Sequence, residues 1–354
     1  MVDKLKEING TVGVAILMEV ATGDIKAIVN MTKCNDGVYR EIRNNAVSDM
    51  MEPGSTFKTA SIMVALEDGY ITPDQNVDTG NGVYMMHGRP MKDHNWHRGG
   101  YGVINTTQIL MYSSNIGVSR LVDENYHKNP EKFVEGLYKL GLATPLNLDI
   151  PGAAKKPNIR MPNKINWSKT ALAWMSIGYE TQVPPMNTLA FYNAIANNGK
   201  MVKPRFVKSI MKDGEVIEDI PVEVINPAIA SPKTIEQIQM ILEKVVSEGL
   251  GKKAGSNQFH VSGKTGTAQV AQGGVYKSGN MRYLVSFCGY FPSEAPKYSC
   301  IVAIQKPGLP ASGGLMAGSV FSEIAERVFA KHLAKDLKEA KDSTSILTPD
   351  VKHG

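Results

Sequence analysis

Cysteine is scarce in this sequence, and its few copies are poorly placed for cross-linking or for metal binding. The chain has three, Cys34, Cys288 and Cys300, and none forms a Cys-x-x-Cys pair. An odd, scattered set of this kind gives neither a disulfide framework nor a zinc site. Cys288 and Cys300 stand among apolar neighbours, which predicts buried thiols, with a disulfide between adjacent strands as the alternative.

Long apolar runs and strongly basic stretches are also missing. No segment approaches the length of a membrane span, and residues 1–10 are charged where a signal peptide would have its apolar core. The net charge of +5 is dispersed, without Lys and Arg runs interleaved with aromatic residues, so we expect no nucleic-acid partner. We expect a soluble chain, and its 42% hydrophobic content is enough for one large core or two lobes sharing one.

Metal and nucleotide motifs are incomplete. The segment HGRPMKDHNWH holds His87, His94 and His97, but it offers no fixed third ligand at a zinc spacing. We expect a loop near a cleft there, and neither a metal nor a cofactor. A phosphate-binding loop needs glycine directly before its lysine, and Phe57 stands in that place before Lys58, which argues against nucleotide binding.

The most informative residues are a serine and a lysine three positions apart, Ser55 and Lys58, in MEPGSTFKTASIMVAL. This spacing places a hydroxyl and an amine on one face of a helix, where a neutral amine can take the hydroxyl proton. Ser113-Ser114-Asn115 and then Lys264-Thr265-Gly266 follow along the chain. The ordered set S-x-x-K, S-x-N and K-T-G is typical of serine acyl-enzymes that bind penicillin.

Each motif also occurs a second time, so local context has to separate the copies. Ser209 and Lys212 repeat S-x-x-K across a KDGE turn between two strand-like runs. Residues 277–279, Lys-Ser-Gly, match a K-[ST]-G pattern, and residues 278–280, Ser-Gly-Asn, match S-x-N. Both lie in a polar, glycine-rich loop that we expect to be mobile. Ser55, in contrast, opens an apolar helix, and Lys264 lies in an extended run bounded by glycine, which favours the first set.

The motif residues predict distinct catalytic roles. Ser55 is the predicted nucleophile, because a helix start favours developing negative charge. Lys58 is the predicted base, if burial and a second cation, Lys264, keep it neutral part of the time. Ser113 can relay a proton to the leaving amine, and Asn115 can hold Lys58 and a substrate amide. Lys264 is predicted to supply positive potential.

The strand that carries Lys264 is predicted to bind the substrate. Thr265 and Thr267 offer hydroxyls to a substrate carboxylate, and Gly266 belongs to the same predicted substrate-binding segment. The backbone N–H groups of Thr267 and Ser55 could form an oxyanion hole, since preorganised donors of this kind stabilise acyl-transfer intermediates.

The hydrophobic pattern places strands at both chain ends and helices between them. The pattern predicts mostly loops over residues 69–104 and a hairpin around Asp213-Gly214 over residues 203–225. The main elements follow. Strands are expected over residues 12–30 (a hairpin), 261–270, 283–291 and 298–305, and helices over 105–141, 184–198, 231–248 and 318–335. The simplest architecture is a sheet built from the two ends with an inserted helical lobe and the site at their seam.

Four segments resemble one known family closely. EPGSTFKT, MYSSNIGVSRL, SGKTGTAQ and residues 177–204 are similar to the motif regions of the transpeptidase domain of class B penicillin-binding proteins of the cell-division type. The resemblance runs from about residue 10 to 333. It implies an α/β fold like that of serine β-lactamases, with an antiparallel five-stranded sheet flanked by helices and an all-helical subdomain.

The resemblance also implies a reaction and a setting. The reaction is D,D-transpeptidation of peptidoglycan stem peptides ending in D-Ala-D-Ala through a Ser55 acyl-enzyme, with covalent inhibition by β-lactams. The setting is the periplasmic face of the bacterial inner membrane, beside a glycosyltransferase and other division proteins. The family's N-terminal membrane helix and pedestal domain do not appear in this sequence, so we expect a catalytic ectodomain over residues 1–335 with a flexible tail over 336–354.

Two other functions stay open at this point. A D,D-carboxypeptidase or a β-lactamase could share the three motifs, although no E-x-x-L-N pattern for a deacylating glutamate follows Asn115. A sensor that is only acylated by penicillin would keep the motifs without turnover.

Overall fold

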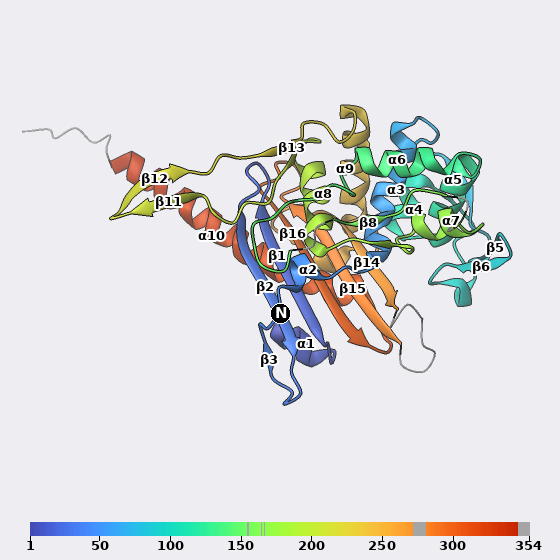
Figure 1. Cartoon of the computed structure of the whole chain (residues 1–354), viewed down its shortest axis with the longest axis horizontal. Coiled ribbons are helices and arrows are strands. Elements are labelled where there is room, and N and C mark those ends of the chain that lie inside the picture. The colour runs from blue at the N-terminus through green and yellow to red at the C-terminus, as the bar shows by residue number, and fades with distance from the viewer. Residues whose placement is uncertain (154–155, 164, 166, 272–280, 346–354) are drawn as a thin grey trace, which may run out of the picture.

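The chain folds around one antiparallel sheet in which its two ends meet (Figure 1). The computed structural model describes residues 1–153, 156–163, 165, 167–271 and 281–345, with only the backbone course over 333–345. The sheet contains, in spatial order, β14 (Ser262–Val270), β15 (Arg282–Phe291), β16 (Tyr298–Pro307), β1 (Val12–Glu19), β2 (Ile25–Lys33) and β3 (Tyr39–Arg40). The five long strands are those predicted, and the two-residue β3 is an edge strand that the sequence does not predict.

The central strands are apolar on both faces because both faces of the sheet are covered. β1 is buried over six consecutive residues and pairs with β16 along its whole length. Cys288 faces one core and Cys300 the other, since Cys288 lies opposite Ile301 and Cys300 opposite Gly289. Both are buried free thiols, so the alternative of a disulfide between them is wrong.

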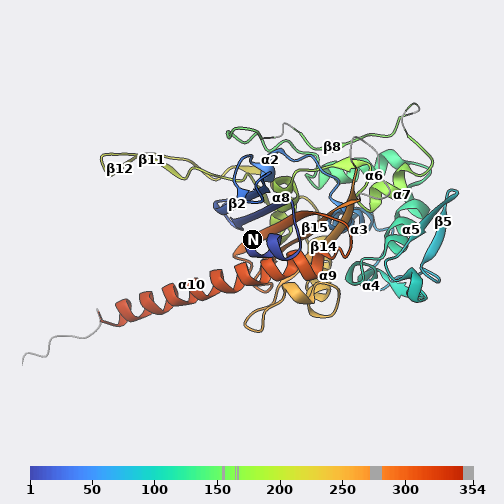
Figure 2. The same ribbon diagram turned by 90° about the horizontal axis from the view of Figure 1, so that it is seen from below.

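Helices cover the two faces of the sheet, as Figure 2 shows for α8 (Pro185–Ala196) on one side and α10 (Gly318–Ser345) with α1 (Val2–Glu7) on the other. Under α10, the buried Phe321 packs edge-on against Phe287 and Phe291 of the sheet, so an apolar face of the helix covers this side of the sheet. The helix continues to Ser345, beyond the predicted end near residue 335. Residues 346–354 of the predicted tail lie outside the described residues.

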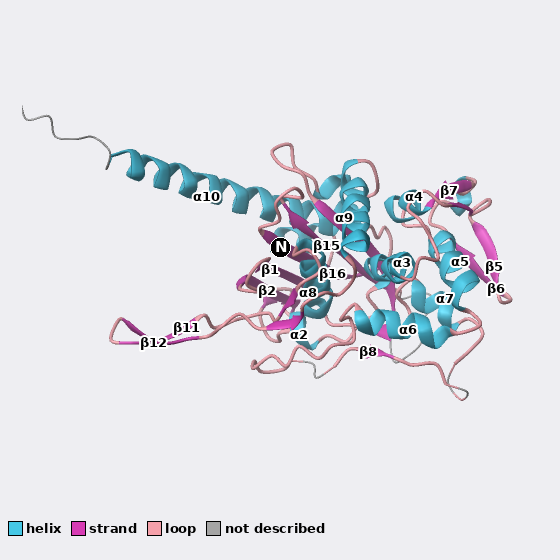
Figure 3. Cartoon of the chain, turned by 90° about the horizontal axis from the view of Figure 1, so that it is seen from above, coloured by secondary structure: helices cyan, strands magenta, loops and turns pink. Residues whose placement is uncertain are grey.

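The inserted helices form a second lobe beside the sheet (Figure 3). They are α3 (Lys58–Glu67), α4 (Thr106–Met111), α5 (Asn115–Tyr126), α6 (Pro130–Lys139), α7 (Ala171–Ser176) and α9 (Pro232–Ser247), with the short α2 (Asn45–Ser48) nearer the sheet. Asn105 caps α4 in a reciprocal capping box with Gln108, as its sequence position predicts. α8 is followed by Asn198 and Gly199 at φ 53° and 90°, a left-handed conformation that ends the helix.

Short hairpins replace part of the loop region expected over residues 69–104. They pair β4 (Asn76–Asp78) with β7 (Val103–Asn105), and β5 (Val83–Met86) with β6 (Arg89–Lys92). β8 (Asn158–Ile159) pairs with β9 (Thr181–Gln182), and β10 (Met201–Val202) with β13 (Val224–Asn226). The predicted hairpin around Asp213-Gly214 is confirmed as β11 (Ser209–Lys212) and β12 (Glu215–Asp219), and it projects from the body (Figure 3).

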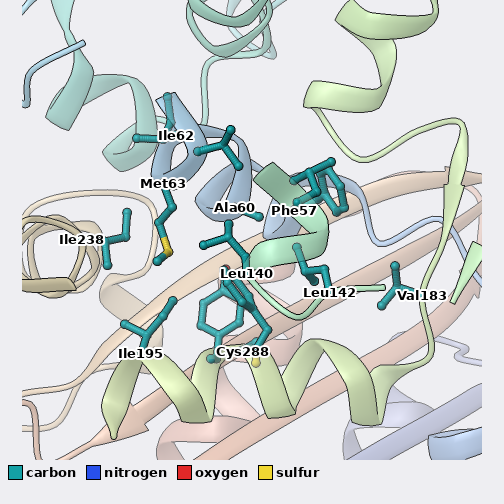
Figure 4. Packing of buried hydrophobic residues seen from close by; sticks show 14 of the residues in the cluster. Phe57, Ala60, Ile62, Met63, Leu140, Leu142, Val183, Ile195, Ile238 and Cys288 are labelled. Carbon is teal, nitrogen blue, oxygen red and sulfur yellow. The ribbon is translucent and has the colours of Figure 1, made fainter. Parts of the chain in front are cut away.

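One continuous core joins the sheet to the helical lobe (Figure 4). Phe57 and Met63, from the segment that carries Ser55, pack with Ile195 of α8, Ile238 of α9 and Cys288 of β15. The nucleophile segment is therefore held from both sides of the seam. Among the described helices, none combines the length and the apolar character needed to cross a bilayer.

Candidate active site

Ser55 lies on a tight 3₁₀ turn, Gly54–Phe57, that runs directly into α3. The turn packs against the edge strand β14, and Gly54, at φ 60°, allows this approach, since a Cβ there would lie 2.6 Å from the Cβ of Ala268. The sequence predicted an ordinary helix start, and the tighter turn instead presses the serine segment onto the strand that carries Lys264. Ser55 is half-buried and lines a cleft.

Two buried lysines meet at the hydroxyl of Ser113. Lys58 Nζ donates to Ser113 Oγ at 3.2 Å and to the Ser113 carbonyl at 2.6 Å. Lys264 Nζ donates to the same Oγ at 2.9 Å and to the Thr265 carbonyl at 3.0 Å. All three sequence motifs are thereby brought together. Between Ser55 Oγ and Lys58 Nζ, both within the described part of the chain, no hydrogen bond forms in this unliganded geometry, and such contacts often tighten only with substrate.

Burial changes the protonation of both lysines. Neither side chain has any exposed surface, and desolvation lowers the pKa of Lys58 from 10.5 to about 7, against the charge of Asp93, which raises it. Burial and then the neighbouring charge of Lys58 lower the pKa of Lys264 well below its usual value. Near neutral pH the two amines therefore hold fewer than two protons. The predicted role of Lys264 assumes a fixed positive charge, and this environment does not favour that charge.

The hydroxyl of Ser113 is placed to pass a proton between the two amines. A hydroxyl can accept a hydrogen bond from a charged amine while it donates to a neutral one. Ser113 has a φ of 54°, in the left-handed region that costs a non-glycine residue about 1 kcal/mol or more. The relay role predicted for Ser113 is compatible with this position and stays a prediction.

Asp93 organises the start of α5 and was missed by the sequence analysis. Its carboxylate accepts from Ser114 Oγ at 2.8 Å and from the backbone N–H groups of Asn115 and Ile116 at 2.6 and 3.1 Å. A carboxylate at a helix N-terminus is favourable, and these bonds fix the S-x-N motif. Asp93 stands inside the histidine-containing segment that was expected to be a loop near the cleft, but nothing in its spacing marks it out.

Asn115 lies in the cleft wall but makes a different contact from the predicted one. Its amide nitrogen donates to the carbonyl of Lys92 at 2.7 Å. Within the described residues it makes no hydrogen bond to Lys58, whose amine is turned to Ser113. The amide of Asn115 remains on the cleft surface, where the predicted contact with a substrate amide is open to test.

A cleft of about 500 Å³ connects these groups. Ser55, Ser113, Thr265 and Thr267 line it, so the two threonines of β14 share a cleft with Ser55, and their predicted contact with a substrate carboxylate stays a prediction. Gly266 does not line it. This glycine is buried, and a Cβ there would collide with Ser286 Oγ and lie 3.1 Å from Thr56. Gly266 thus allows close packing behind the strand, and its predicted part in substrate binding stays a prediction.

Residues 311–315 form another part of the cleft wall, beside β14, and the sequence motifs gave no sign of them. The backbone N–H of Gly313 donates to Thr267 Oγ1 at 3.1 Å, and the exposed Leu315 adds an apolar surface. The segment begins a π-helical turn, Gly313–Ala317, that leads into α10. The run of small residues Ala-Ser-Gly-Gly, four residues after the end of β16, is the signal that could have indicated a close backbone approach.

The three histidines of the predicted loop separate in space. His94 lines the cleft near the Tyr101 hydroxyl, His87 pairs with Asp123 at 2.8 Å, and His97 packs against Trp96. In the described part of the chain, no cluster of three or more His, Cys, Asp or Glu side chains could hold a metal ion. The decoy Ser209 and Lys212 lie on the projecting hairpin, and the decoy residues 277–280, with the loop expected to be mobile, lie outside the described residues.

Known proteins are similar to this chain in sequence and in fold. Residues 13–326 match the family model described as the penicillin binding protein transpeptidase domain. Penicillin-binding protein PbpB of Mycolicibacterium smegmatis is 29% identical over 350 residues, covering 94% of this chain and 52% of the relative. The peptidoglycan D,D-transpeptidase FtsI of Buchnera aphidicola is 29% identical over 323 residues, covering 89% and 52%. The chain thus spans about half the length of these curated relatives.

A solved structure supports the fold. The apo transpeptidase domain of penicillin-binding protein 3 from Burkholderia pseudomallei aligns with a TM-score of 0.75 and 28% sequence identity, covering 93% of this chain and 91% of that one. The predicted fold, a mixed α/β structure with a central antiparallel sheet flanked by helices, is confirmed.

Proposed function

Because the chain belongs to the penicillin-binding protein transpeptidase family, among its class B, division-type members, we propose that Ser55 is the acylated nucleophile of a peptidoglycan D,D-transpeptidase. The observation that carries the proposal is the pair of buried lysines sharing Ser113 Oγ at 3.2 and 2.9 Å beside the cleft that Ser55 lines. An amine with a pKa of about 7 is close to the best value for a base at neutral pH.

The reaction has two halves. Ser55 Oγ attacks the carbonyl of the penultimate D-Ala, and its proton moves to the neutral amine of Lys58. The bond to the terminal D-Ala breaks, and the leaving amine takes a proton through Ser113. An acceptor amine then attacks the Ser55 ester, which forms the new amide and returns the proton to the serine. The hydroxyls of Thr265 and Thr267 hold the terminal carboxylate of the donor before cleavage.

The same site accounts for inhibition by β-lactams. Attack of Ser55 on the lactam carbonyl opens the ring, but the leaving nitrogen stays attached to the acyl group. The acceptor's place is then blocked and the ester persists. The absence of an E-x-x-L-N pattern after Asn115 is in keeping with slow hydrolysis.

The longer protein implied by the relatives is part of the proposal. By analogy with the FtsI relatives, we propose that this longer protein works at the periplasmic face of the inner membrane, where an anchor outside this chain holds it. A glycosyltransferase and division proteins are proposed as its partners. Tethering at a membrane raises effective concentration by orders of magnitude, so we expect the isolated chain to bind β-lactams well but to cross-link nascent glycan poorly.

Intact-protein mass spectrometry tests the proposal. Penicillin is expected to add one adduct to the chain and none to Ser55→Ala. A thioester mimic of D-Ala-D-Ala, offered with a D-amino acid, then separates the candidate functions. Transfer to the amino acid marks a transpeptidase, release of free acid a carboxypeptidase or β-lactamase, and a stable adduct without turnover a sensor. An adduct that persists in Ser55→Ala overturns the assignment of the nucleophile.

A further inference from the structure

The hairpin β11–β12 carries exposed apolar side chains far from the catalytic cleft. It projects from the body at the opposite end of the molecule from the helical lobe (Figure 1 and Figure 3). Four large apolar side chains of its two strands are 46–62% exposed, namely Ile210, Met211, Val216 and Ile217. A two-stranded hairpin is only marginally stable by itself in water, and gathered exposed apolar residues mark interaction surfaces. The hairpin is therefore a candidate contact surface.

The register of the two strands distributes their side chains over two faces. Ile210 of β11 lies opposite Glu218 of β12, and Lys212 lies opposite Glu215. Residues directly opposite each other in an antiparallel pair share a face, and so do alternate residues of one strand. These four side chains therefore lie together on one side of the hairpin, which we call the Ile210 face.

The Ile210 face is basic along one strand and acidic along the other. The carbonyl of Lys208 accepts from the backbone N–H of Ile220 at 2.9 Å, so Lys208 continues the ladder two positions before Ile210 and adds a second lysine to this face. All its charged side chains are exposed, and none forms an ion pair with another described residue. The lysines on one strand are Lys208 and Lys212, and the glutamates on the other are Glu215 and Glu218.

A face with this charge pattern is complementary to a second copy of itself. In a dimer with two-fold symmetry the same surface meets itself. When two hairpins stack face to face about an axis parallel to their strands, β11 of each copy lies over β12 of the other. The lysines of each copy then meet the glutamates of its partner, and the two copies of Ile210 lie between the charged rows.

The same charges disfavour the alternative of pairing at the free strand edges. A two-fold axis would then place β11 beside a second β11, or β12 beside a second β12. Like charges would face each other across the new pair, which is unfavourable, and charged side chains are a usual means of preventing edge-to-edge pairing. Charge complementarity thus selects one occupant, a second copy, and one arrangement, face on face.

We propose that the Ile210 face is a self-association surface through which two copies of this chain form a two-fold dimer, with both hairpins pointing in the same direction. The clefts stay open, because the helical lobe lies at the other end of each copy (Figure 1). The proposal does not depend on the proposed enzymatic function. One hairpin face is small beside the roughly 800 Å² per partner of a standard interface, so we expect a dissociation constant of about 10 μM or weaker.

Sedimentation equilibrium of the full chain tests the proposal. At low ionic strength the average mass should rise toward twice the chain mass as the concentration passes through about 10–100 μM. Salt at about 0.5 M should weaken the association about tenfold, since exposed ion pairs are screened. Thermal unfolding of every variant serves as the control for folding.

Two charge variants make the test specific to the hairpin. The double variant Lys208→Glu with Lys212→Glu has two acidic strands, and Glu215→Lys with Glu218→Lys has two basic strands. Each should stay monomeric where the wild-type chain dimerises, because like charges then meet across the interface. An equal mixture of the two variants should dimerise again, since each supplies the charges that the other lacks.

A pair of neighbouring substitutions assigns the contact to one face. Ile210→Thr should weaken the association about five- to tenfold, whereas Met211→Thr should leave it unchanged, because Met211 lies opposite Val216 on the other face. Threonine suits a strand, so both variants should keep the hairpin. A chain that is monomeric at every concentration, a mixture of charge variants that stays monomeric, or equal losses in the two threonine variants would overturn the proposal.

Discussion

Replacing Lys58 by methionine should abolish acylation and yet make the folded chain more stable. Methionine has a similar length and no charge, so it tests what burial of the amine costs. The side chain of Lys58 is completely buried, and its pKa falls from 10.5 to about 7. At about 1.4 kcal/mol per pKa unit, protonated Lys58 destabilises the fold by roughly 5 kcal/mol.

The sign of the pH dependence follows from the same shift. Between about pH 7 and 10.5 the unfolded chain binds the Lys58 proton and the folded chain does not. Stability of the wild-type chain therefore rises with pH across this window, while below pH 7 the full penalty is present. Methionine removes the penalty but leaves the Ser113 carbonyl without its 2.6 Å donor, which costs about 1–3 kcal/mol.

The balance predicts a gain of about 2–4 kcal/mol for Lys58→Met at pH 7, and no gain by about pH 9.5. Urea unfolding of both chains at the two pH values measures it; loss of the Lys58 charge also raises the pKa of Lys264 in the variant, which adds to the gain at pH 7. The rate of penicilloylation should fall by about 10²–10⁴-fold, as for loss of a general base. A variant less stable than wild type at pH 7, or a stability difference that does not change with pH, would refute the reasoning. Near-normal acylation would mean that another base acts.

Two further substitutions test the supports of the site. Gly266→Ala should lower the free energy of unfolding by about 1–3 kcal/mol, because the added Cβ collides with Ser286 Oγ. The double variant with Ser286→Ala should recover part of this loss, and no recovery would mean that the clash lies elsewhere. Asp93→Asn should weaken the start of α5 by about 1–3 kcal/mol in thermal unfolding and, because the charge of Asp93 raises the pKa of Lys58, should shift the acylation–pH profile to lower pH. An unshifted profile would contradict that coupling.

The residues that the sequence singles out meet at one cleft because each motif carries its own local geometry. Three residues of helical spacing, a capped helix start and an alternating strand are short-range features, and Ser55, Ser113 and Thr265 lie where these features put them. The strands at the two chain ends can likewise be read from their apolar runs. These apolar runs need to be covered on both faces, which favours the centre of a sheet, and there β1 pairs with β16, with Val12 opposite Gln305.

The parts that the sequence does not predict depend on long-range packing. Asp93 acts only because the hairpin before it places a carboxylate at the start of α5. The motif predicts that Gly266 takes part in substrate binding. Its lack of a side chain also leaves room for Ser286 behind the strand, which the sequence does not show. The wall formed by residues 311–315 has no polar motif, since its contact with Thr267 is made by a backbone N–H.

The environment of the two amines explains why this site can hold a base at all. A carboxylate in contact with Lys58 would keep the amine protonated and remove its basicity. Among the described residues no acidic side chain forms an ion pair with Lys58 or Lys264, and their partners are carbonyls and the hydroxyls of Ser113 and Thr265. Asp93 stands nearby, but its oxygens are committed to the start of α5. The fold thus accepts an unfavourable burial of two amines, held in place by the shared core of sheet and helices, and the lowered pKa that results is the property that acyl transfer requires.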